Sequence, residues 1–169
     1  MTQADEINGS SATVLCKACG LCCTGHLFVW TKLRSAELES IRSLGLNVIR
    51  EPNQRGFNQP CPLWDGICTI YTSPQYPRFC GTYKCKLLKQ VLDEVTPLHS
   101  ALTIVQQTKS LIHKLDMVLP HSPNPNFRER LVAYLEKENS GMEFQRQAKE
   151  LLVIYESQFG VNDLLGNGN

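Results

Sequence analysis

All eight cysteines of this 169-residue chain fall between residues 16 and 85, and this concentration limits what the chain can fold into. They are Cys16, Cys19, Cys22, Cys23, Cys61, Cys68, Cys80 and Cys85, whereas the last 84 residues contain none. Cysteines that serve only as small buried apolar residues would be scattered along the chain. The segregation therefore predicts one site region built from thiols.

The sequence context favours metal ligation over disulfides for these thiols. Residues 1–15 contain Asp5 and Glu6, no Lys or Arg, and no apolar stretch long enough for a signal peptide. No run in the sequence reaches the ~20 apolar residues that a membrane-spanning helix needs. We therefore expect a cytoplasmic protein with no membrane role. The cytosol is reducing and disfavours disulfides, so the thiols are free to bind metal.

The first four cysteines have the spacing of metal ligands, in the motif Cys16-x-x-Cys19-x-x-Cys22-Cys23. A tight turn through such a motif can bring three sulfurs around one ion, with metal–sulfur bonds of ~2.3 Å. Cys22 and Cys23 are adjacent and point to opposite sides of an extended backbone, so we expect them to serve two different sites. The second group of four cysteines supplies further ligands, and eight thiolates could complete two tetrahedral zinc sites.

An iron–sulfur cluster is the alternative to zinc. In bacterial ferredoxins, three cysteines at C-x-x-C-x-x-C spacing and a remote cysteine followed by proline are cluster ligands. Here Cys16, Cys19 and Cys22 could be joined by Cys61, which precedes Pro62. The pattern leaves both zinc and an iron–sulfur cluster open as the cofactor. With an iron–sulfur cluster, the protein could be an enzyme or an electron-transfer protein.

A thiol redox module is a further alternative, in which Cys22 and Cys23, or Cys80 and Cys85, cycle between thiol and disulfide. The sequence has no recognisable catalytic dyad and no G-x-G-x-x-G nucleotide loop. Catalytic residues stay unknown, and whether the chain is an enzyme stays open. His26 follows Cys23 by three residues and is a reserve ligand, although a polar or core role suits it better.

The cysteine motifs together resemble those of the YkgJ-like cysteine-cluster family, which carries the CxxCxxCC signature followed by C-P-x-L, C-x-I-Y and R-P-x-x-C-R-x-F-x-C. The matching segments are residues 61–64 (CPLW), 68–71 (CTIY) and 76–85 (YPRFCGTYKC). Tyr76 and Gly81 stand where arginines are common in that family. The resemblance covers residues 16–85 and implies a zinc- or iron-chelating domain with all eight cysteines as ligands.

The charge distribution bears on the partner. Residues 16–90 contain ten Lys or Arg against four acids, a balance of 10 − 4 = +6, although the whole chain carries only +1. A basic frame would offset the negative charge of four-thiolate metal centres. Phosphate binding needs a contiguous basic stripe, whereas these charges are dispersed, so a nucleic-acid partner is disfavoured.

The remaining sequence predicts an α+β, mainly α fold. We expect a strand over residues 26–32, a helix between Ser35 and Gly45, a loop over 51–61 and little regular structure over 61–85. Apolar spacing predicts a short helix near 87–91 and a long helical face over 98–119. Capping boxes at Asn126 and Ser140 predict two more helices, the last of which stops at Gly160.

These elements define the expected organisation: a flexible tail (1–13), an irregular, metal-nucleated cysteine domain with short strands (14–95), and a helical extension of about three helices packed on it (96–169). Trp30, Trp64 and Tyr71 could form an aromatic wall beside the metal, although packing alone would explain them. The helical half could bind a protein partner, but its apolar stripes are more simply explained as core.

Overall fold

The computed structural model describes residues 10–137 and 140–162. The α-helices are α1 (Ser11–Cys19), α2 (Leu38–Ser43), α3 (Arg78–Thr82), α4 (Lys86–Leu92), α5 (Leu98–Asp116), α6 (Phe127–Leu135) and α7 (Met142–Ile154). A 3-10 turn, η1 (Ser35–Glu37), precedes α2, and a π turn, η2 (Tyr155–Phe159), follows α7. Three short strands, β1 (Trp30–Lys32), β2 (Val48–Glu51) and β3 (Gln54–Asn58), complete the described fold, which is α+β as expected.

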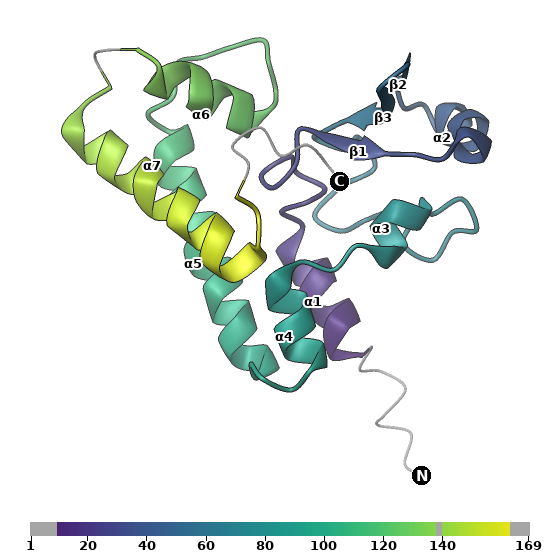
Figure 1. Cartoon of the computed structure of the whole chain (residues 1–169), viewed down its shortest axis with the longest axis horizontal. Coiled ribbons are helices and arrows are strands. Elements are labelled where there is room, and N and C mark those ends of the chain that lie inside the picture. Colours follow the sequence, from purple (N-terminus) through teal and green to yellow (C-terminus); the bar gives the residue numbers. More distant parts are fainter. Residues whose placement is uncertain (1–9, 138–139, 163–169) are drawn as a thin grey trace.

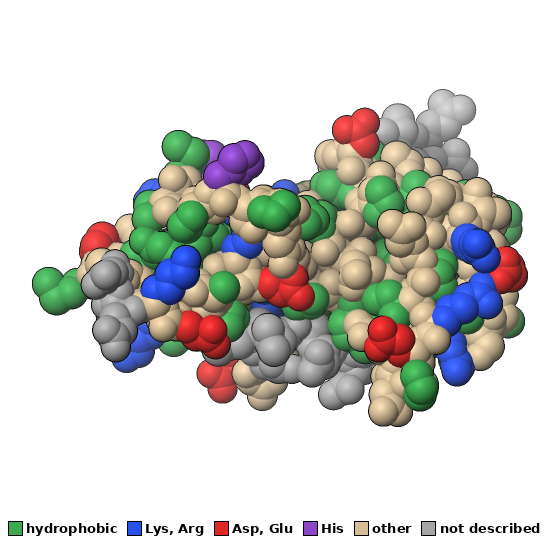
Figure 2. Space-filling view, turned by 90° about the horizontal axis from the view of Figure 1, so that it is seen from above, with side chains coloured by type: hydrophobic (Ala, Val, Ile, Leu, Met, Phe, Trp, Pro, Cys, Tyr) green, Lys and Arg blue, Asp and Glu red, His purple; other side chains and the backbone are tan. Residues whose placement is uncertain are grey.

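The sheet and the long helices lie at opposite ends of the molecule. Figure 1 shows α5, α6 and α7 on one side, the sheet with α2 on the other, and α1 and α4 between them. Figure 2 shows Lys and Arg side chains gathered at the end that belongs to the sheet and α2. Exposed Arg42, Arg50 and Arg55 belong to this end, where Arg50 forms an ion pair with Glu39.

The sheet is antiparallel throughout, in the order β1-β3-β2. The predicted strand at 26–32 is confirmed only for Trp30–Lys32, and the predicted loop at 51–61 is wrong, because β2 and β3 form a hairpin there. Pro52 lies in the hairpin turn rather than in a long loop. Gly56 lies within β3, where a Cβ would meet the backbone of Thr31 on β1, so glycine permits the close approach of the two strands.

The first two cysteines lie on a helix rather than in a tight turn. Ser10 caps α1, since its hydroxyl accepts a hydrogen bond from the Thr13 amide at 3.3 Å. Gly20 ends α1 with φ 64°, in the left-handed conformation that glycine adopts without strain. α1 begins inside the segment assigned to the tail, and residues 1–9 lie outside the described residues.

The helical extension contains α5, α6 and α7, and α4 and α5 lie where the apolar spacing predicts them. Asn126 caps α6 as expected, because its side-chain oxygen accepts from the Glu129 amide at 3.1 Å. Ser140 is not a helix cap, since α7 begins at Met142 after Gly141. Gly160, with φ 71°, ends the last turn. Among the described residues, no helix is long and apolar enough to cross a membrane.

One large core joins the cysteine segment to the helical extension. Leu15, Leu21, Leu27 and Phe28 share this core with side chains of α4, α5, α6 and α7. α1 packs against both α4 and α5. A smaller core under the sheet contains Leu33, Leu38, Ile41, Leu46 and Phe57. The predicted domain boundary between residues 95 and 96 stays a prediction. The large core holds α1 and α4 beside each other.

Candidate metal centre

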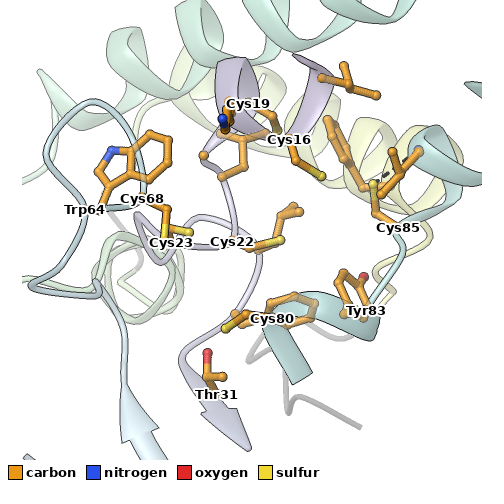
Figure 3. Close-up of a pocket in the computed structure, with 18 of the residues that line it drawn as sticks. Cys16, Cys19, Cys22, Cys23, Thr31, Trp64, Cys68, Cys80, Tyr83 and Cys85 are labelled. Carbon is orange, nitrogen blue, oxygen red and sulfur yellow. Dashed lines mark hydrogen bonds between the residues drawn. The ribbon is translucent and has the colours of Figure 1, made fainter. Parts of the chain in front are cut away.

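The eight cysteines come from five parts of the fold. Cys16 and Cys19 lie on α1, Cys22 and Cys23 in the turn that follows, Cys61 and Cys68 in the loop after β3, Cys80 on α3, and Cys85 at the N-cap of α4. Seven of them line one cavity of about 100 Å³, and Cys61 is the exception. All eight are free thiols. Figure 3 shows the seven lining cysteines distributed around this space.

Four of these cysteines form what we call the first group: Cys16, Cys19, Cys22 and Cys85. Burial, followed by repulsion from Cys85, raises the pKa of Cys16 to about 11. Burial also raises the pKa of Cys22 well above its ordinary value, with repulsion from Cys19 and Cys85 next in size. Figure 3 shows the sulfurs of Cys16, Cys22 and Cys85 directed toward the same space. The packing of α4 on α1 therefore makes Cys85 the fourth member of the first motif.

The other four cysteines form the second group: Cys23, Cys61, Cys68 and Cys80. Burial, then repulsion from Cys68 and Cys61, raises the pKa of Cys23 to about 12. The pKa of Cys80 is also raised, by burial and then by repulsion from the other three members of the group. The Cys61 amide donates to the Cys23 carbonyl at 2.7 Å, which holds the two backbones together. The two groups adjoin at Cys22 and Cys23, and whether these two cysteines serve different sites stays a prediction.

This grouping differs from the ferredoxin-like set expected from spacing. Cys61-Pro62 was the expected partner of Cys16, Cys19 and Cys22, but Cys61 lies with Cys23, and Cys85 takes the fourth position. Spacing along the chain could not reveal this, because the fourth position depends on how α4 packs against α1. Tertiary packing therefore decides which cysteines lie near one another.

Backbone amides favour the thiolate at Cys85. Burial raises the pKa of Cys85, while the amides of Leu88 and Leu87 and its own amide lower it. The Leu88 amide donates to Cys85 Sγ at 3.4 Å, so the sulfur caps the first turn of α4. Amides that point at a sulfur stabilise its negative form, which is the form that binds metal.

Two lysines lie near the first group. Lys109 on α5 donates from Nζ to the Ala18 carbonyl at 2.7 Å, at the C-terminal end of α1. Burial raises the pKa of Cys19 to about 12, and the Lys109 charge acts in the opposite direction. Lys17 Nζ lies 4.9 Å from the centroid of the Tyr71 ring. These charges offset part of the negative charge that thiolates would bring to the end of α1.

An aromatic wall surrounds the cavity, and it is larger than the sequence indicated. Trp64 and Tyr71 line the cavity as expected, whereas Trp30 does not. The remaining aromatic lining consists of Phe28, Tyr76, Phe79 and Tyr83. Phe79 and Tyr83 stack at 5.3 Å, with an interplanar angle of 15°. Their spacing of four residues, flanking Cys80, is the sequence signal that could have identified them.

His26 does not join either group. Thr24 Oγ1 donates to the Gly20 carbonyl at 2.9 Å and lies 2.6 Å from His26 Nδ1, so Nδ1 carries the proton and donates to Thr24. The ring packs at 5.2 Å from Phe127. Burial lowers the pKa of His26 to about 4, so the ring is neutral at pH 7. The ring is half-buried and packs against a core residue, in line with the polar or core role that its position favoured.

A buried polar pair also lines the cavity and was missed from the sequence. Gln59 is 5% exposed and Thr31 is 2% exposed, and Gln59 Nε2 donates to Thr31 Oγ1 at 2.6 Å. Gln59 Oε1 is buried without a hydrogen-bond partner. Neither residue type carries a motif, so only the fold shows that β1 and the end of β3 bring them to the cysteines.

Within the described residues, no set of three or more His, Cys, Asp or Glu side chains is arranged closely enough to hold a metal ion. Comparisons with models of protein families, with curated proteins and with solved structures found no match to this chain. The site is therefore characterised by its donor chemistry: seven thiols line an aromatic cavity, and Cys61 lies beside it.

Proposed function

We propose that this chain is a metal-binding protein in which the first and second groups each form a four-thiolate centre for zinc or an iron–sulfur cluster. The observation that carries the proposal is that seven of the eight cysteines line one cavity, while the eighth, Cys61, lies beside Cys23. Four thiolates are the donor set of structural zinc sites and of [4Fe-4S] clusters alike. The resemblance to the YkgJ-like cysteine-cluster family agrees with this proposal.

The thiol pKa values indicate what metal binding would involve. At pH 7 and without metal, thiols with pKa values of about 11 and 12, such as Cys16 and Cys19, are protonated. Metal binding must displace these protons, so affinity should rise with pH. Binding must also draw sulfurs together, which couples it to the folding of the segments that carry them.

The cavity favours an iron–sulfur centre as a second, more specific candidate. A cluster needs space between its ligands, and seven of the thiols border a cavity of about 100 Å³. The aromatic lining would limit access of water, which is one of the factors that set the potential of such a centre. On this candidate the protein transfers electrons or uses the cluster in an enzymatic reaction.

Anaerobic purification followed by metal and sulfide analysis tests both candidates. A brown protein that absorbs near ~400 nm, with about four iron and four sulfide per cluster, would identify the iron–sulfur form. A colourless protein with two zinc ions would identify the zinc form. A protein with neither, whose thiol count changes with redox potential, would refute metal binding and support the thiol redox alternative.

Two single variants test the division into groups. Cys85→Ser should remove the first centre and Cys80→Ser the second, so each variant should retain half of the metal. Loss of all metal in both variants, or of none, would contradict two separate centres. Leu115→Ala is the control, because Leu115 is fully buried in the large core and its truncation should cost ~2–5 kcal/mol of stability without loss of metal.

A further inference from the structure

Gln59 is the one buried cavity residue whose side chain has an unused polar atom, and this atom needs a partner. The side chain is 5% exposed, and Oε1 has no hydrogen-bond partner among the described residues. A buried polar atom without a partner costs ~1–3 kcal/mol. Such groups call for an explanation, and a group that binds in the cavity would supply one.

The position of Gln59 relates it to the second group. Its backbone amide donates to the Val29 carbonyl at 2.8 Å, and its carbonyl accepts from Asn126 Nδ2 at 3.1 Å. Two residues later, the Cys61 amide donates to Cys23. Figure 3 shows the Thr31 hydroxyl, the partner of Gln59, directed toward Cys80. Thr31 is therefore directed toward one member of the second group, and Gln59 is linked through the backbone near it to two others, Cys61 and Cys23.

The hydrogen-bonding capacity of the pair determines which partner fits. With Nε2 donating to Thr31, the free atom Oε1 can only accept a hydrogen bond. Rotation of the amide by 180° lets the Thr31 hydroxyl donate to Oε1 and turns the Nε2 protons toward the cavity. In that orientation the Thr31 hydroxyl and Gln59 Oε1 are hydrogen-bonded, and the atom without a partner is the donor Nε2. Metal-bound sulfur is an acceptor, so it selects this second orientation.

We propose that Gln59 is a positioning residue for the second centre, with its side-chain amide donating a hydrogen bond to metal-bound sulfur and Thr31 holding the amide in place. This inference rests on the proposed metal-binding function. Outer-shell hydrogen bonds of this kind orient ligands and strengthen metal binding, and their loss lowers metal affinity ~10–100-fold. Gln59 should have no such effect on the first centre.

Cobalt(II) titration of the reduced full chain under anaerobic conditions tests this assignment, with Co²⁺ as the probe. In a Cys85→Ser background, which retains only the second group, Gln59→Leu should weaken Co²⁺ binding ~10–100-fold. In a Cys80→Ser background, which retains only the first group, the same change should leave the affinity unaltered. The thiolate-to-cobalt absorption of the second centre should move to longer wavelength, because a lost hydrogen bond raises the energy of the sulfur lone pairs.

Gln59→Glu separates donation from packing. A glutamate has the same shape and can accept from the Thr31 hydroxyl, but it cannot donate to sulfur when ionised. We expect it to bind Co²⁺ no better than Gln59→Leu. Wild-type affinity in the Glu variant would show that the residue acts only through Thr31 and would overturn the proposal, as would equal losses of affinity in the two cysteine backgrounds.

Two further variants guard against a loss that reflects folding alone. Gln59→Leu combined with Thr31→Val removes both partners and leaves no orphan hydroxyl, so the fold should survive while the affinity loss remains. Thr108→Val is the matched control, because Thr108 is equally buried but bonds to the Ile104 carbonyl in α5. Unchanged affinity in the double variant would refute the role of Gln59. A wild-type chain that binds no Co²⁺ would instead refute the metal-binding proposal, and one that binds a single Co²⁺ would refute the two separate centres on which this inference depends.

Discussion

Gly20 offers a sharp test of how the first cysteine motif is held against the loop that carries Cys68. The residue ends α1 with φ 64°, and the Trp64 ring lies directly over it. A Cβ at Gly20 would overlap Trp64 Cζ2 and Cη2 and lie 2.9 Å from Cε2. Gly45 is a matched control, because it has φ 87° and a Cβ there would meet nothing within 4 Å.

The two alanine variants differ in one energetic contribution. Both place a side chain in the left-handed region, which costs ~1–2 kcal/mol. Only Gly20→Ala also forces the indole out of its place, and overpacking of this kind costs a further ~1–3 kcal/mol. We therefore expect Gly45→Ala to lower the free energy of unfolding by about 1–2 kcal/mol and Gly20→Ala by about 2–5 kcal/mol.

Urea unfolding of the full chain measures these differences, and tryptophan fluorescence locates them. The chain has two tryptophans, so a Trp30→Phe background leaves Trp64 as the sole indole. In that background, Gly20→Ala should shift the emission to longer wavelength as the indole becomes more exposed, and Gly45→Ala should not. Equal destabilisation by the two variants, with unchanged emission, would refute the contact between Trp64 and Gly20.

His26 should contribute a pH-dependent part of the stability. Its folded pKa of about 4 lies below the ordinary 6.5, so unfolding takes up a proton between these values and stability falls as pH drops from 6.5 to 4. The free energy of unfolding of the wild type should fall by about 3 kcal/mol between pH 7 and pH 4 through this residue. His26→Gln lacks this contribution, so its free energy of unfolding should fall by that much less over the same range. Equal falls in the two proteins would exclude a neutral His26 ring in the folded state. Metal removal by a chelator should increase amide hydrogen exchange in residues 61–76 more than in α1, and equal exchange in both segments would contradict the coupling of this loop to metal.

The sequence indicated the site region but not its internal division. Segregation of the cysteines predicted one site, and the adjacency of Cys22 and Cys23 predicted that they face different groups. The long apolar periodicity of α5 was equally informative, because a 19-residue helix repeats its pattern several times. Features with many repeats or strong local geometry were therefore accessible without the structure.

Features that depend on contacts between distant segments were not accessible. β3 resembled a loop because Gly56 weakens a strand pattern, yet that glycine is required by the approach of β1. α1 is only 9 residues long with one buried leucine, Leu15, so its periodicity was hidden by the cysteines. Gln59 and Thr31 carry no motif and reach the cavity only through the sheet register.

The two groups differ in how much of their position the protein core determines. Three members of the first group lie on α1 or at the start of α4, and both helices pack in the large core. The second group includes Cys61 and Cys68, in a loop where no residue from 61 to 76 is fully buried. A segment with so little buried apolar surface cannot offset its own conformational entropy. On the proposed metal-binding function, the helical core would order the first group without metal, whereas the loop of the second group would depend on bonds between metal and sulfur.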